Sequence, residues 1–114
     1  MEVHSKHRIW LEIDGAKFMG KGHVQLLRAI QKTGSLNKAA KETGISYRKS
    51  WRLIHQVNTM AVHELVQLQK GGAGGGGAMV TSYGEKLLSF FENLMDTTTV
   101  HLDNELKKAN DLWD

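Results

Sequence analysis

The segment from Ser35 to Asn58, SLNKAAKETGISYRKSWRLIHQVN, has the pattern of two helices joined by a tight corner. Ser35 is a suitable N-cap, because a serine hydroxyl can accept a free backbone N–H of the first helical turn. Gly44 is placed to end the first helix, since glycine adopts the left-handed conformation without a Cβ clash. Ser46 can cap the second helix. This pattern indicates either a DNA-binding helix-turn-helix or an ordinary helical hairpin with a solvated basic face.

The second helix of this pair has two chemically different sides. Its inward stripe is expected to be Ser50, Ile54 and Val57. Residues in the first turns of a recognition helix reach base edges, where arginine commonly binds guanine, whereas lysine and serine suit phosphates. For Trp51, packing in the core is an alternative to base contact. The residues predicted here to contact DNA are Ser35, Ser46, Tyr47, Arg48, Lys49, Trp51, Arg52 and His55.

Basic residues are concentrated in the first half of the chain. Residues 1–59 contain 11 Lys and Arg against 4 Asp and Glu, a net of +7, whereas residues 60–114 contain 4 against 8, a net of −4. A polyanion is therefore expected to bind the first half. The absence of cysteine excludes disulfides and cysteine-ligated zinc, and the six histidines have no ligand spacing, so no metal or cofactor is expected.

Length and hydropathy place the chain among small globular proteins. The 114 residues, 40% of them apolar, suffice for one domain with a real core. No apolar run approaches the ~18–20 residues of a membrane span, and the first ten residues lack the apolar core of a signal peptide. A cytoplasmic protein without a membrane partner is the expectation.

The region before the helix pair is expected to complete a small α/β unit. Residues 8–14 alternate apolar and polar side chains, which predicts a half-buried strand, and Asp14-Gly15 is a hairpin signal with a return strand over residues 17–19. Residues 23–33 have helical periodicity and supply the third helix that a helix-turn-helix needs. Trp10 lies on the polar face of the strand, where either a partner chain or the long helices are expected to cover it.

Two apolar segments, residues 65–70 and 78–81, flank the glycine-rich sequence GGAGGGG of residues 71–77. We interpret them as the strands of a β-wing whose tip follows the DNA backbone. A flexible linker and a phosphate-binding loop are alternatives, but a P-loop requires Gly-Lys-Ser/Thr followed by a helix. The wing residues predicted to contact DNA are Lys70, Gly72, Gly74 and Gly75.

The last segment is expected to be a long helix that begins near Ser82. Its apolar residues recur at spacings of three and four, as in a coiled-coil seam, although a helix folded back on its own core has the same pattern. Four β-branched residues at 97–100 interrupt the seam and are expected to mark a bend or break. We predict a DNA-binding domain at 1–96 and a dimerising extension at 97–114. The predicted dimerisation residues are Trp10, Leu88, Phe91, Met95, Leu102, Leu106 and Trp113.

Several of these elements together resemble a known family. The run from Gly34 to Asn58, followed by LVQLQKGGAGGGGAMVTSYGEKLL, resembles the N-terminal DNA-binding domain of the molybdate-responsive ModE-type regulators, which is similar to the winged helix-turn-helix of LysR-type regulators. The resemblance covers roughly residues 9–94. Its most specific parts are Ile45-Ser46-Tyr47 with Trp51 and Asn58, the glycine-rich wing, and Thr81 with Gly84.

The resemblance implies a mainly α fold with a small β component, a winged helix-turn-helix dimer, and a near-palindromic operator in double-stranded DNA. Full ModE-type regulators continue into small β-barrel domains that bind molybdate. Nothing here resembles those domains, so molybdate sensing is not carried over from the resemblance, and no small-molecule effector is evident in this chain. The expected function is a sequence-specific DNA-binding transcriptional regulator. The alternative is a protein-interaction module or accessory DNA-binding subunit that pairs through its C-terminal helix. An enzyme is not expected, because no nucleophile–base pair is evident.

Overall fold

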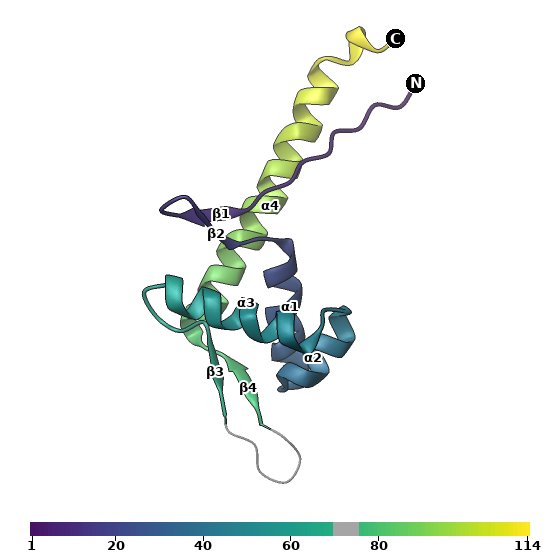
Figure 1. Ribbon diagram of the computed structural model, residues 1–114. Helices are drawn as coiled ribbons and strands as arrows, with labels where there is room; N and C mark the ends of the chain where they lie inside the picture. Colours follow the sequence, from purple (N-terminus) through teal and green to yellow (C-terminus); the bar gives the residue numbers. More distant parts are fainter. Residues whose placement is uncertain (70–75) are drawn as a thin grey trace.

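The computed structural model describes residues 1–69 and 76–114 of the chain. In these residues it has two antiparallel hairpins and four α-helices, which confirms the mainly α winged-helix expectation (Figure 1). The elements are β1 (Leu11–Ile13), β2 (Ala16–Met19), α1 (Lys21–Thr33), α2 (Leu36–Thr43), α3 (Tyr47–Met60), β3 (Val66–Leu68), β4 (Ala78–Val80), α4 (Ser82–Lys108) and a 3-10 turn, η1 (Asn110–Leu112).

The N-terminal hairpin is shorter than the alternating pattern suggested. β1 covers Leu11–Ile13 rather than residues 8–14, and its pairing with β2 shifts register between Leu11 and Glu12. The turn is a tight one, since Asp14 and Gly15 both have positive φ angles, of 52° and 82°. The predicted alternation persists, with Leu11 and Ile13 half-buried and Glu12 exposed.

Helix α1 begins two residues before the predicted start. Its first turn is closed by the ring of His23, whose Nδ1 accepts the backbone N–H of Gly20 at 3.1 Å. The helix ends as expected, at Gly34 with φ 69°. Local capping thus explains why two glycines near the start do not delay this helix.

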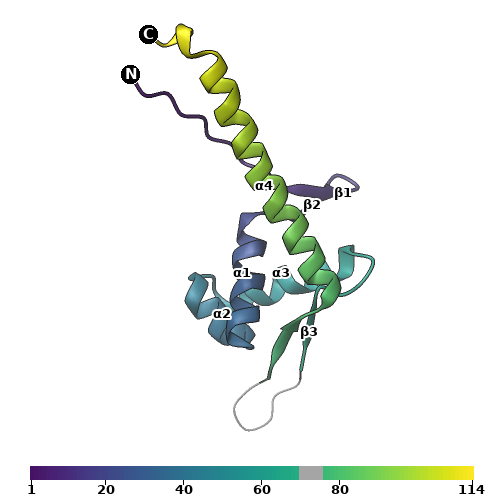
Figure 2. The ribbon, with the colours of Figure 1, turned by 180° about the vertical axis from the view of Figure 1, so that it is seen from behind.

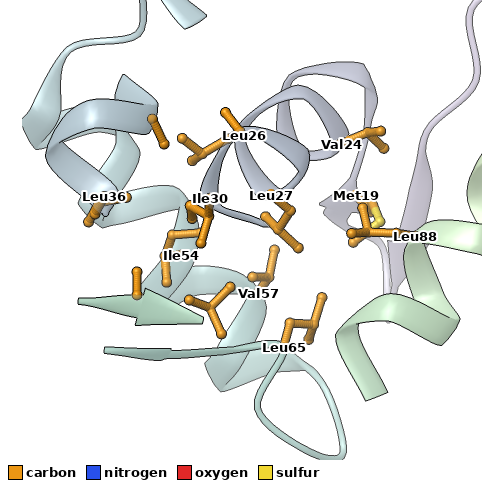
Figure 3. Packing of buried hydrophobic residues seen from close by; sticks show 14 of the residues in the cluster. Met19, Val24, Leu26, Leu27, Ile30, Leu36, Ile54, Val57, Leu65 and Leu88 are labelled. Carbon is orange, nitrogen blue, oxygen red and sulfur yellow. The ribbon is translucent and has the colours of Figure 1, made fainter. Parts of the chain in front are cut away.

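The core lies between α1, α3, the base of the wing and the first half of α4 (Figure 3). Leu26, Leu27 and Ile30 of α1 face Ile54 and Val57 of α3, and all five are fully buried. Leu65 closes the core from the wing side, and Leu88 closes it from α4. The three-helix unit is therefore held as one body.

The predicted break at residues 97–100 is wrong, because α4 continues through them. Each threonine hydroxyl donates to a carbonyl one turn back: Thr97 to Asn93 at 2.9 Å, Thr98 to Leu94 at 2.7 Å and Thr99 to Met95 at 3.0 Å. These bonds satisfy the hydroxyls within the helix. The proposed domain boundary after residue 96 falls inside this continuous helix.

The second half of α4 projects away from the three-helix unit, and the first nine residues run beside it (Figures 1 and 2). His7 Nε2 lies 2.9 Å from Thr99 Oγ1, which links this N-terminal arm to the helix. The molecule is consequently elongated, measuring 63 × 29 × 22 Å. Within the described residues, no helix is both long enough and apolar enough to cross a membrane.

Two of the predicted dimerisation residues belong to the core of the single chain. Leu88 and Phe91 both have 0% exposure, so their side chains are not available to a second copy. In the first half of α4 the apolar stripe packs against the core of its own domain. The 3–4 spacing alone does not distinguish this packing from a dimer contact. Met95, Leu102, Leu106 and Trp113 are half-buried along the rest of the stripe.

Candidate nucleic-acid interface

The corner between α2 and α3 is built by local backbone bonding. Gly44 has φ 73°, and its N–H is directed at the last carbonyls of α2. The next amide, that of Ile45, donates to Ala40 O at 3.2 Å, and its half-buried side chain packs against the core. Ser35 and Ser46 act as N-caps, because their hydroxyls accept the backbone N–H of Lys38 and Lys49. These contacts fix the direction in which α3 leaves the corner.

Helix α3 buries one face and exposes the other. Ser50, Ile54 and Val57 have 0% exposure, as predicted for the inward stripe. The opposite face brings together four exposed side chains that can carry or acquire positive charge, namely Arg48, Lys49, Arg52 and His55. Its aromatic flank is equally open, since Tyr47 is 53% exposed and Trp51 is 47% exposed. The predicted α3 residues therefore share one accessible surface.

Trp51 does not pack in the core, so that alternative is wrong. Its ring stacks on the ring of His55 one turn further on, with centroids 3.7 Å apart and planes 35° apart. The stack lies on the flank of α3 that faces the wing, because Trp51 and His55 each line a groove together with wing residues. An exposed aromatic pair beside two arginines is suited to the sugar, methyl and phosphate surfaces of DNA.

The wing is tied to α3 by a residue that the charge and periodicity patterns did not single out. Asn58 Nδ2 donates to Val66 O at 2.8 Å, and Asn58 Oδ1 accepts the amides of Leu65 at 2.8 Å and Val66 at 3.2 Å. One side chain thus satisfies three backbone groups. Among the sequence features, only the family resemblance drew attention to this asparagine.

The two wing strands pair as expected. Val66 lies opposite Val80, and Gln69 N donates to Gly77 O at 2.8 Å where the strands lead into the tip. The wing also contacts the end of α1, since Ala78 N donates to Gly34 O at 2.9 Å. The four predicted wing contacts, Lys70, Gly72, Gly74 and Gly75, lie outside the described residues.

A groove of about 530 Å³ separates the wing from α2 and α3. Tyr47 and Trp51 form one wall, and Leu68 and Gln69 form the other. The lining also includes three polar residues of α2 that the sequence did not single out, namely Asn37, Lys38 and Lys41. The sequence does not show that α2 lies close to the wing, so it could not mark them as candidates.

One basic side chain outside this surface, that of Arg28, serves the fold instead. Arg28 of α1 forms salt bridges to Glu85, at 2.5 Å, and to Glu92, both on α4. Hydrogen bonding to Glu92 raises the pKa of Arg28, while hydrogen bonds from Gln31 and Arg28 lower the pKa of Glu85. In the described part of the chain, Arg48, Lys49 and Arg52 have no such acidic partner. Their charge is therefore available to a ligand.

The buried side chain of His23, near the start of α1, is kept neutral. It is 5% exposed, and burial, followed by the nearby charges of Lys17 and Lys49, lowers its pKa from 6.5 to about 4. Within the described residues, its Nε2 has no hydrogen-bond partner. The ring consequently acts as a neutral helix cap at physiological pH.

The chain was compared with known proteins, and no protein-family model matches it. It is 40% identical over 84 residues to the transcriptional regulator ModE of Yersinia pestis, which covers 74% of this chain and 32% of that protein. The DNA-binding transcriptional dual regulator ModE of Escherichia coli K12 is 37% identical over the same shares.

A longer match is the molybdenum transport protein ModE of Azotobacter vinelandii, which is 31% identical over 105 residues, or 92% of this chain and 39% of that protein. The chain thus spans about a third of the length of the relatives it matches. Over that third it is similar in sequence to ModE regulators, which confirms the resemblance predicted from its helix pair and wing.

Proposed function

We propose that this protein is a sequence-specific DNA-binding transcriptional regulator whose α3 enters the major groove. The observation that carries the proposal is the division of α3 into a fully buried stripe and an exposed basic and aromatic face. A helix that projects only its contact face is suited to a groove ~12 Å wide. The similarity to a transcriptional regulator and to a DNA-binding transcriptional dual regulator supports the same function.

We further propose that the protein binds a near-palindromic operator as a homodimer. Two copies of α3 in successive major grooves would lie ~34 Å apart along the duplex. Trp10, which is 46% exposed, and the half-buried stripe of Met95, Leu102, Leu106 and Trp113 are the remaining candidates for the contact. Sedimentation of the purified protein tests this point, because a monomer at micromolar concentration would contradict it.

The substitution Arg52→Ala tests the assignment of α3. Removing one arginine that reads a base should cost about 1–3 kcal/mol of binding free energy and relax the base preference at one position. Lys86→Ala is the charge-matched control, because Lys86 is exposed on α4. Affinities are measured by titration of a labelled operator duplex at fixed salt. Equal affinities for the two variants would refute the assignment.

The projecting half of α4 supports a second candidate function. Its apolar stripe is only half-buried, so the helix can pair with a different protein and make this chain an accessory DNA-binding subunit. Under that alternative, the purified protein is a monomer and gains operator affinity when its partner is added. A homodimer that binds the operator alone would exclude it.

A further inference from the structure

Helix α3 has a second β-hairpin on the side away from the wing. Gln56 Nε2 of α3 donates to the carbonyl oxygen of Lys17 in β2 at 3.1 Å, whereas Asn58 holds the wing on the other flank. The β1–β2 hairpin and the wing therefore bracket α3, one on each side (Figure 1). The sequence predicts DNA contacts for the wing but none for the β1–β2 hairpin.

The flank of α3 that faces the β1–β2 hairpin is basic. Lys49, Arg52 and Gln56 follow one another at i, i+3 and i+7 and are all exposed, so they form a continuous stripe beside Lys17. The charges of both Lys17 and Lys49 act on the buried ring of His23, so both ammonium groups lie near that ring. Among the described residues, neither lysine forms a salt bridge.

The side chain of Lys17 is held in place by its neighbours. Its Nζ lies 5.9 Å from the centroid of the Trp10 ring, and Trp10 Nε1 donates to Glu12 Oε2 at 2.9 Å. This cation–π contact leaves the ammonium group accessible, since Lys17 is exposed. Within the single chain, the half-exposed ring of Trp10 thus lies beneath the ammonium group of Lys17.

We propose that the β1–β2 hairpin is a second element that binds the DNA backbone, with Lys17 and Lys49 contacting phosphates on the side of α3 opposite the wing. The inference rests on the proposed function. A helix in the major groove has one sugar–phosphate strand on each side, and the wing can reach only one of them. The basic stripe and Lys17 of the hairpin lie on the flank of α3 that would face the other strand, and their positive charges suit its phosphates.

Salt dependence of DNA binding tests the proposal. The logarithm of the binding constant falls with the logarithm of salt concentration by about 0.9 for each phosphate contacted. Lys17→Gln and Lys49→Gln should each lower that slope by about 0.9 and weaken binding to operator and to unrelated duplex by the same factor. Lys17→Arg should restore the slope, because it keeps the charge, and Lys86→Gln should leave it unchanged.

Three outcomes separate this inference from the function on which it rests. An unchanged slope for Lys17→Gln and Lys49→Gln, in a protein that binds its operator, would overturn the hairpin contact alone. A loss of preference for operator over unrelated duplex would also overturn it, because phosphate contacts carry no base information. If the wild-type protein binds no duplex at all, both proposals fall.

A second measurement locates the contact on the DNA. Operator duplexes with a single neutral methylphosphonate linkage are titrated with wild-type protein and with Lys17→Gln. One linkage should weaken the wild type but not the variant, and it should lie across the major groove from the linkages that the wing contacts. If every linkage affects both proteins equally, Lys17 has no phosphate partner and the proposal is refuted.

Discussion

Helices α3 and α4 are both amphipathic, but they differ in how much of the apolar stripe the core buries. The inward stripe of α3 is fully buried along the helix, from Ser50 to Val57, and its outer face carries the exposed charges of Arg48, Lys49 and Arg52. α4 buries Leu88 and Phe91 completely, then leaves the domain with a stripe that is only half-buried, and the N-terminal arm runs beside this part of the helix (Figure 1). The domain therefore fixes α3 as a whole and α4 only over its first half.

The largest expected effect separates the two halves of α4. Phe91→Ala should lower the free energy of unfolding by about 3–5 kcal/mol, because it empties a fully buried aromatic site. Leu106→Ala, at a half-buried position, should cost the isolated chain under about 1 kcal/mol. Urea denaturation at low protein concentration gives both values, and equal costs would contradict the division of the helix.

The start of α4 provides the next test, because it packs tightly against the wing. A Cβ atom at Gly84 would clash with Leu65 O and would lie 2.9 Å from Val80 Cγ1. Gly84→Ala should therefore destabilise the fold by about 3 kcal/mol, through overpacking against backbone.

Gly22→Ala is the matched control for that substitution. Its added Cβ meets nothing within 4 Å, and alanine in a helix should stabilise the protein by about 0.5–1 kcal/mol. The two melting temperatures should thus move in opposite directions. If both variants are destabilised, a general intolerance of alanine, rather than the contact between α4 and the wing, explains the loss.

The last of these effects concerns the His23 cap at the start of α1 and depends on pH. The pKa of His23 is about 4 when folded and 6.5 when free, so the unfolded chain binds its proton first as pH falls. The free energy of unfolding should therefore decrease between about pH 6.5 and pH 4, by at most about 3 kcal/mol. His23→Asn keeps an acceptor for the Gly20 amide but cannot titrate, so its stability should change less over this range. Denaturation curves at several pH values measure the difference, and identical pH profiles would show that His23 is not responsible.

Features set by local chemistry were predictable from the sequence. Ser35, Gly44 and Ser46 each act within one helical turn, so their residue types were enough to place the caps of α2 and α3. The alternation of β1 and the inward stripe of α3 followed from periodicity for the same reason. The predicted exposure of Arg48 and Arg52 needed only the opposite side of that stripe.

Features that depend on tertiary contacts were not predictable. A 3–4 apolar spacing in α4 has the same appearance whether the stripe covers its own core, as at Phe91, or faces another surface. The run of threonines could not be recognised as helical without knowing that each hydroxyl would bond one turn back. The bond from Asn58 to the wing and the position of the β1–β2 hairpin on the opposite flank of α3 became visible only in the folded structure.

Selection of bound duplexes from a random DNA pool tests the central claim most directly. With the wild-type protein, the account predicts enrichment of two inverted half-sites whose centres lie about 10–10.5 base pairs, or a multiple of that, apart. Arg52→Ala should lose or relax one position in each half-site, and Lys86→Ala should select the same sequence as the wild type. A pool with no enriched sequence, or one that Arg52→Ala reproduces unchanged, would contradict the assignment of α3 as the reader of DNA.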